Sequence, residues 1–204
     1  MQNKIKRHDI LGLSVVGHIK IEDADTGEVF VSKRNAINPE VVSIALANLM
    51  ADTQTTDGLP SSIMELALGG GGVDVSINGS LTYKSTNTTG IGRSLYNETY
   101  SKVVNTKVGD VGYADNNIVV THIPNTLYTD LVINCTLDYS EPSGQEATAN
   151  GNKNYPRDTW TYVFDEIGLR TQSGELLTHV IFHPVNKAAD RKIRIIYTVR
   201  LTVG

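Results

Sequence analysis

Residues 160–204, WTYVFDEIGLRTQSGELLTHVIFHPVNKAADRKIRIIYTVRLTVG, decide the fold because they contain three segments with the two-residue period of β-strands. The first begins with alternating aromatic side chains at Trp160 and the residues that follow. A chain reversal is indicated at residues 172–174, and residues 176–182 form a second apolar run. From residue 193 to residue 203 every second side chain is apolar, which indicates a strand with one buried face. The stretch therefore predicts three strands of a β-domain.

Length and charge limit the classes of function. A chain of 204 residues can bury one good core, so we expect a single β-sandwich-like domain over residues 1–204. The net charge of -4 argues against a surface that neutralises many phosphates, and we expect no specific nucleic-acid partner. Because no apolar run approaches the ~20 residues of a membrane-spanning helix, and no convincing signal peptide is present, we also expect no membrane partner.

The rest of the chain predicts more strands and one helix. Asn38-Pro39-Glu40 supplies an N-cap residue, a proline at the first helical position and an acid in the first turn, so a short α-helix is predicted at about 39–51. Apolar residues occupy much of its circumference, and we expect it to be largely covered, across a sheet or the end of a sandwich. Turn residues at 23–27 and at Asn78-Gly79 predict hairpins. The predicted fold class is mainly β, an antiparallel β-sandwich with one short helix and long polar loops.

Two stretches are candidates for contact arms. Residues 140–158 have almost no apolar content, and a loop of this length within a compact domain is usually a contact arm or disordered. Residues 84–116 begin with a loop rich in Ser, Thr, Asn and Gly. We expect both stretches to contact partners, and removal of residues 141–157 should leave the fold intact.

The glycine run Gly69–Gly72 suggests an anion-binding loop, but the residues that follow it do not fit one. A phosphate-binding loop ends in Gly-Lys-Ser/Thr and enters a helix, whereas this run precedes the strand-like alternation of residues 73–77. We expect a flexible corner or a bulge. Residues 23–34 faintly resemble a calcium loop, but Glu28 stands where that loop needs glycine.

Histidines, acids and the cysteine predict no catalytic or metal centre. On one strand His179 and His183 would be ~13 Å apart, too far to share a zinc ion, and we expect both to be partly exposed. The adjacent Asp165 and Glu166 would point to opposite faces of a strand. Cys135 lies in an apolar strand, where a thiol packs as a small apolar group. We predict no catalytic residue, metal or cofactor.

A structural role is predicted for the closing strands instead. Asp165, Glu166 and Gly168 interrupt the apolar period, which indicates a bulge or bend. Glu166 would then be available to pair with the basic strand that carries Arg194 or Arg200. The candidate structural and assembly residues are Trp160, Phe164, Glu166, Gly168, Pro184, Lys187, Arg194 and Arg200.

Four motifs of this region carry a family resemblance. They are Phe164-Asp-Glu-Ile-Gly-Leu169, Ser173-Gly-Glu-Leu-Leu177, Phe182-His-Pro-Val-Asn-Lys187 and the strand from Ile193 to Leu201. Together they resemble the closing β-module of structural proteins in tailed-bacteriophage virions. The resemblance implies a non-enzymatic virion protein, made in the host cytoplasm, near the neck, collar, tail or fibre attachment, or a capsid decoration subunit. It also implies other virion proteins as partners and a homo-oligomer, either a ring or another symmetric assembly.

Two other classes of function stay open. A carbohydrate-binding or adhesin-like module could use Trp160 and the nine tyrosines as stacking surfaces, and exposed aromatic side chains clustered in one groove would favour it. A hydrolase whose catalytic triad is assembled only in space would bring His122 or His179 beside an acid and a hydroxyl nucleophile.

Overall fold

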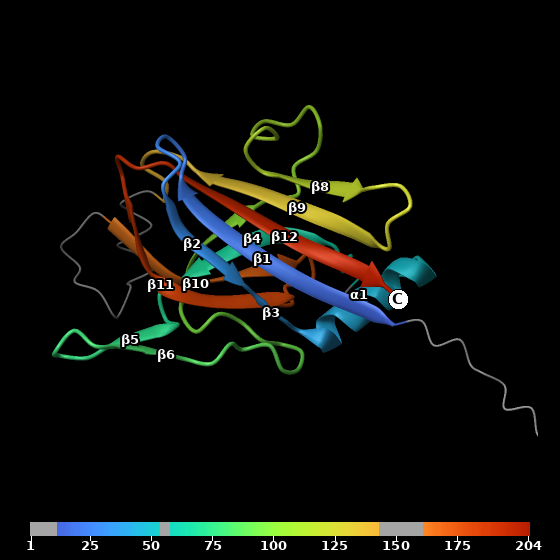
Figure 1. Ribbon diagram of the computed structural model, residues 1–204, viewed down its shortest axis with the longest axis horizontal. Coiled ribbons are helices and arrows are strands. Elements are labelled where there is room, and N and C mark those ends of the chain that lie inside the picture. The colour runs from blue at the N-terminus through green and yellow to red at the C-terminus, as the bar shows by residue number, and fades with distance from the viewer. Residues whose placement is uncertain (1–11, 54–57, 143–160) are drawn as a thin grey trace, which may run out of the picture.

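The computed structural model describes residues 12–53, 58–142 and 161–204, which form a sandwich of two five-stranded antiparallel sheets (Figure 1). Sheet 1 has the order β2 (Val29–Arg34), β1 (Leu13–Asp23), β12 (Ile193–Val203), β9 (Tyr128–Leu137) and β8 (Asn117–His122). Sheet 2 has the order β3 (Ala36–Ile37), β11 (Thr178–Ala188), β10 (Thr161–Thr171), β4 (Ile63–Gly69) and β7 (Glu98–Val103). The predicted mainly β, sandwich-like fold with one helix is confirmed.

The three closing strands are present, and they belong to different sheets. β10 and β11 pair with each other in sheet 2, and the reversal between them contains Gly174 at a φ of 85°. β12 instead pairs with β1 on one side and β9 on the other, at the centre of sheet 1. The predicted alternation of β12 is confirmed, because Ile193, Ile195 and Tyr197 are buried. Trp160 lies outside the described residues.

Side chains from both sheets form one main apolar cluster. Sheet 1 contributes Ile19, Ile133 and Tyr197, and sheet 2 contributes Phe164 and Leu169. The Phe164 ring stacks against Tyr162 with 5.7 Å between ring centroids. Cys135 is fully buried in the same cluster, as its apolar strand predicts. This shared core holds the two sheets face to face.

Both predicted hairpins are present. Between β1 and β2 the carboxylate of Asp23 accepts hydrogen bonds from the backbone N–H groups of Asp25 and Thr26, at 3.0 and 2.9 Å. Gly27 follows with a φ of 75°. These acids therefore shape a turn, as expected from their turn chemistry. The second hairpin joins β5 (Val73–Val75) to β6 (Leu81–Tyr83) as a separate two-stranded sheet.

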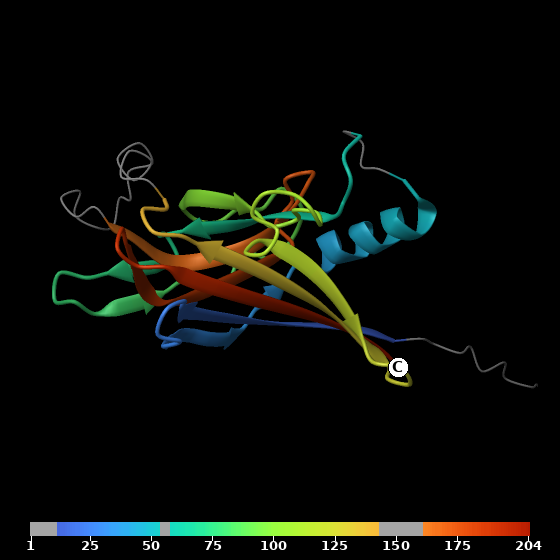
Figure 2. The same cartoon turned by 90° about the horizontal axis from the view of Figure 1, so that it is seen from above.

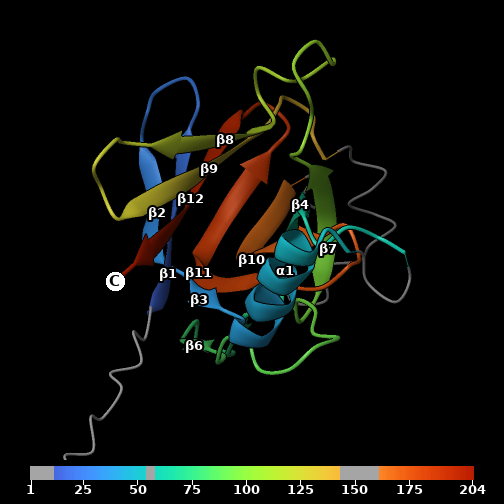
Figure 3. The ribbon, with the colours of Figure 1, turned by 90° about the vertical axis from the view of Figure 1, so that its right-hand side faces the viewer.

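The helix α1 (Pro39–Ala51) occupies the predicted residues, but the expectation that it is largely covered is wrong. Asn38 caps it by accepting a hydrogen bond from the Val41 backbone N–H. α1 lies at one end of the sandwich, beside sheet 2 (Figures 2 and 3). Val41 is its one buried residue, whereas Leu49 is 76% exposed and Met50 is 88% exposed. The helix contacts the sandwich along one side only, so apolar side chains on its other sides remain exposed.

The predicted contact arm at 84–116 is divided by a strand. Its first part, residues 84–97, lies against sheet 2, and β7 then forms the edge of that sheet. Residues 104–116 form the loop to β8, and Val108 and Val111 are exposed on it. Only this last part resembles the expected arm. Of the other predicted arm, 140–158, residues 143–158 lie outside the described residues.

Candidate functional site

Glu166 faces away from the main core because a bulge in β10 beside it shifts the alternation of its side chains by one residue. The pairing of β10 with β11 is irregular between Phe164 and Glu166, so the predicted bulge is confirmed. Before the irregularity Phe164 packs into the main core, and after it Ile167 and Leu169 do. Pro184 lies at the matching irregularity on β11, between the buried residues Phe182 and Val185. The change of phase places the carboxylate of Glu166 on the outer side of sheet 2.

Four hydrogen-bond donors surround the carboxylate of Glu166, which is fully buried. Its Oε1 accepts from the backbone N–H groups of Gly71 and Asn97, at 3.1 and 2.7 Å. Its Oε2 accepts from the backbone N–H of Tyr96 at 2.9 Å and lies 3.0 Å from Nε2 of His179. A buried carboxylate is costly unless such donors replace its water shell. We call these five residues the Glu166 site.

The hydrogen bonds of His179 define its tautomer. The backbone N–H of Asn87 donates to Nδ1 of His179 at 2.8 Å, and an N–H can donate only to a ring nitrogen that carries no proton. The ring proton is therefore on Nε2, from which it is donated to Glu166. The prediction that His179 is partly exposed is wrong, because its side chain is fully buried, while His183 on the same strand is exposed. Alternation along the strand did not reveal that residues 84–97 cover this position.

The glycine run binds the protein's own carboxylates. Besides the bond from Gly71 to Glu166, the backbone N–H of Gly72 donates to Asp165 at 2.8 Å. A Cβ atom on Gly69 would stand 2.5 Å from the backbone oxygen of Asn97. The predicted bulge is present between Leu68 and Gly69, but the run is buried rather than a flexible corner. Glycine is needed here for the close approach of two backbone segments.

Residues 84–97 form a cover over the outer face of sheet 2. Leu95 packs there against Ala67 and Leu176 in a second, small apolar cluster. Gly168 leaves room for this contact, because a Cβ at that position would lie 2.4 Å from the Thr178 backbone oxygen and 2.6 Å from the side chain of Leu176. The Glu166 site therefore attaches a polar surface segment to the closing strands.

A second polar cluster fixes the beginning of the 140–158 stretch. Lys102 on β7 donates to both carboxylate oxygens of Glu141, at 2.6 and 2.5 Å, and Tyr100 donates to the same group at 2.5 Å. Burial opposes ionisation of Glu141, but these hydrogen bonds outweigh it and lower its pKa. Nearby, the buried Lys187 donates to the backbone oxygen of Asp138 at 2.9 Å, and burial lowers the pKa of its amine.

The basic residues of β12 have other partners than predicted. Arg200 makes two hydrogen bonds of 2.7 Å to Asp130 on the neighbouring β9, and Arg194 lies 3.6 Å from Glu22 on β1. Their expected pairing with Glu166 is wrong because β10 and β12 belong to different sheets and Glu166 points away from sheet 1. Both arginines are exposed on sheet 1. Their ion pairs contribute modestly to stability.

The Glu166 site anchors the backbone of residues 71, 87, 96 and 97 to β10 and β11. An acid or base that acts on a substrate must reach it, and the side chains of Glu166 and His179 are both fully buried. Within residues 12–53, 58–142 and 161–204, no group of three or more His, Cys, Asp or Glu side chains is placed to hold a metal ion. No helix in the same ranges combines the length and the apolar character needed to cross a membrane.

Comparison with family models, with curated proteins and with solved structures found no match to this chain.

Proposed function

We propose that this protein is a non-enzymatic structural subunit of a tailed-bacteriophage virion, in the neck, collar or tail region, that assembles through strand edges and loops. The resemblance of the closing strands to virion proteins supports the class, and a capsid decoration subunit is the alternative within it. Exposed apolar side chains and an unpaired strand edge among the described residues support an assembling protein.

The observation that carries the proposal is the set of large apolar side chains left exposed on well-anchored elements. Leu49 and Met50 project from α1, whose first residue follows the buried cap Asn38. Asn38 is held by a backbone hydrogen bond of 2.9 Å to Leu177 and by a side-chain bond of 2.7 Å to Gly90. Exposed apolar surface of this kind marks sites of protein–protein contact.

The outer edge of sheet 1 offers a further assembly surface. β8 pairs with β9 on one side, and among the described residues no strand pairs with its other side. Val119 and Val120 on this strand are both exposed. A strand edge with unpaired backbone groups can accept a strand or a loop from a neighbouring molecule.

The test of this function is the location of the protein on particles. Particles should be assembled with the intact chain and with a chain lacking residues 143–157, and then imaged by cryo-electron microscopy. We expect density for the intact protein in the neck or tail, and reduced incorporation of the shortened chain although its melting temperature is unchanged. A chain with a Gly/Ser linker of equal length at 143–157 separates the effect of sequence from that of length.

Two results would overturn the proposal. One is that particles contain no copies of the intact protein. The other is a catalytic turnover by the purified protein that a single side-chain substitution abolishes.

A further inference from the structure

The inner face of sheet 1 loses its cover toward one end of the sandwich. Ile19, Tyr197 and Ile133 are register neighbours across β1, β12 and β9, and all three are fully buried. Residues of the same face that lie nearer the end of the sheet are exposed: Val203 by 36%, Leu13 by 50% and Val120 by 66%. Side chains at every second position of a strand share a face, so these apolar residues belong to the face that forms the core.

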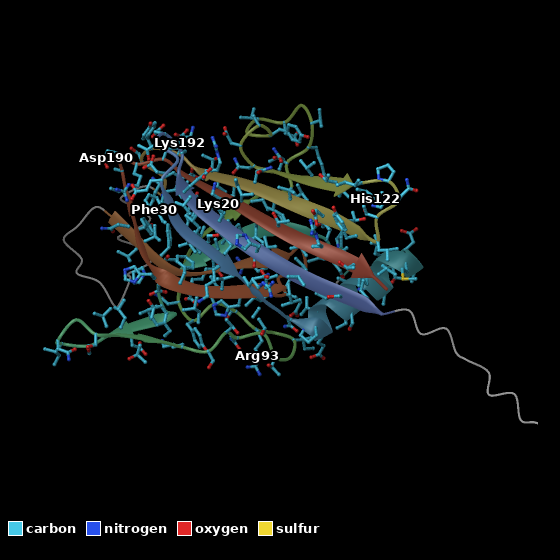
Figure 4. All side chains as sticks on the ribbon, in the orientation of Figure 1. Lys20, Phe30, Arg93, His122, Asp190 and Lys192 are labelled. Carbon is cyan, nitrogen blue, oxygen red and sulfur yellow. The ribbon has the colours of Figure 1, made fainter. Side chains whose placement is uncertain are left out.

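The exposed apolar residues lie toward the same end of sheet 1. Leu13 pairs with Val203, and the backbone N–H of Val203 donates to the oxygen of Leu127, which is also exposed. Figure 4 labels His122, the last residue of β8, at this end and Asp190 at the opposite end. We call Leu13, Val120, Leu127 and Val203 the open end.

The hairpin of β5 and β6 projects from the other end of the molecule (Figure 1). Its tip is well defined, because the backbone N–H of Ser76 donates to Ser80 and that of Gly79 donates to Ser76, each at 2.9 Å. Its base is attached to the sandwich by the Tyr83 hydroxyl, 3.3 Å from Nδ1 of His183. At the tip, the side chain of Ile77 is fully exposed.

The hairpin has one apolar face and one polar face. Val75 pairs with Leu81, and Tyr83 lies on the same face because it pairs with Val73. Asp74 and Thr82 form the pair on the opposite face. On this face Val73 at the base is fully buried, whereas Val75 next to the tip is 45% exposed, so the apolar face is uncovered near the tip. Exposed apolar side chains grouped on one face are typical of protein–protein contact sites.

The two surfaces cannot cover each other within one molecule. Figures 1 and 2 place the hairpin and the open end at opposite ends of the longest axis. Both surfaces are apolar, and one is a protrusion while the other is a core face without its cover. Such complementary patches on opposite ends of one molecule suit a head-to-tail contact between copies.

We propose that the hairpin of one copy of this chain packs its apolar face and Ile77 against the open end of the next copy. The polar pair Asp74 and Thr82 stays in water. Because donor and acceptor surfaces differ, the contact is heterologous, and its repetition produces a ring if the rotation closes or a filament if it does not. The inference rests on the proposed function for the premise that the protein assembles, and it adds the partner and the two surfaces.

The test uses one variant for each surface. Ile77→Asp removes the donor and Val120→Glu removes the acceptor, and each is expected to weaken self-association of the purified chain at least about tenfold. Mixing the two variants should restore one contact, because Val120→Glu keeps its hairpin and Ile77→Asp keeps its open end. Analytical ultracentrifugation should then show a one-to-one dimer that grows no further.

Matched controls separate the surfaces from a general effect of charge. Val16→Glu places the same charge on β1, facing the outer side of sheet 1, and Val29→Asp places it at the first residue of β2; both valines are exposed and lie outside the two surfaces. Both should associate as the unmodified chain does. Leu127→Glu, in the loop beside Val203, provides a second acceptor variant if Val120→Glu lowers the melting temperature.

Three results would overturn the inference. They are a chain that stays monomeric at all concentrations, normal association of either surface variant, and failure of the mixed variants to form the dimer. The location of the protein on particles is measured separately. A monomer that still occupies the neck or tail would therefore remove this contact and leave the proposed function standing.

Discussion

Nε2 of His179 lies 3.0 Å from Oε2 of Glu166, and both side chains are fully buried. The other ring nitrogen accepts a backbone hydrogen bond from Asn87, and the other carboxylate oxygen accepts two more, from Gly71 and Asn97. Backbone groups of two segments, the glycine run 69–72 and the cover 84–97, thus meet at one pair of side chains on β10 and β11. Replacing either side chain leaves buried groups without partners, which is the costly kind of substitution.

Glu166→Gln should lower the free energy of unfolding by about 2–4 kcal/mol. The amide NH₂ group of glutamine would face backbone donors that now point at a carboxylate oxygen. Chemical denaturation measures the effect. Glu175→Gln is the matched control, because Glu175 is partly exposed and accepts one backbone hydrogen bond, from Gly92 at 2.8 Å. Equal losses for the two variants would contradict the importance of burial at Glu166.

The ring proton of His179 should be found on Nε2. Nitrogen-15 NMR distinguishes the two neutral tautomers, and the signal can be assigned by its absence from His179→Gln. The expectation follows from the 2.8 Å bond that Asn87 donates to Nδ1. A proton on Nδ1 would show that the segment 84–97 is not attached in this way.

Gly168→Ala should destabilise the protein by about 1–3 kcal/mol, as insertion of a methyl group into a packed site does. The new Cβ would stand 2.4 Å from the backbone oxygen of Thr178, so β10 and β11 would have to move apart. Gly204→Ala provides the control, since no atom lies within 4 Å of its added Cβ. The melting temperatures of the two variants should differ clearly, and equal values would count against close packing at Gly168.

Glu141 should make stability depend on pH in the acid range. Hydrogen bonds from Lys102 and Tyr100 outweigh the effect of burial, so the folded pKa lies below the usual value of 4.5. The unfolded chain therefore binds the proton more readily. The stabilisation is fully present above about pH 4.5 and is lost as the pH falls through the lower, folded pKa. The difference in melting temperature between the unmodified protein and Glu141→Gln should shrink over that window, and a constant difference would contradict it.

Cys135 should react with thiol reagents only when the protein unfolds. Burial raises the pKa of its thiol to about 12, and its side chain is fully buried in the main core. Iodoacetamide labelling followed by mass spectrometry should show slow reaction of the native protein and fast reaction in denaturant. Fast labelling without denaturant would mean that β9 opens readily.

The sequence was sufficient for elements whose signals are local. The periodicity of residues 193–203 predicted β12, and the cap at Asn38 with Pro39 predicted the start of α1. The interruption at Asp165 and Glu166 predicted the bulge. Each of these depends on the backbone preferences or the spacing of neighbouring residues, which a single sequence contains.

The Glu166 site depended on contacts that no local pattern contains. Its backbone donors come from residues 71, 96 and 97, from 69 to 95 positions away in the chain. The arginine partners were assigned wrongly because the pattern of β10 and β12 does not tell which sheet each strand joins. One signal was available, since a buried strand that carries two adjacent acids needs donors, and a glycine run elsewhere in the chain offers backbone N–H groups that no side chain shields.

The position of β12 has a consequence for how the protein is made. β12 is the middle strand of sheet 1, yet it is synthesised after every other described strand. β1 and β9 therefore leave the ribosome before the strand that pairs with both of them. Until β12 follows, apolar residues such as Ile19 and Ile133 lack the strand that lies between them in the folded sheet. A chain interrupted before residue 193 would lack the centre of the sheet, so sheet 1 can form only after β12 has been synthesised.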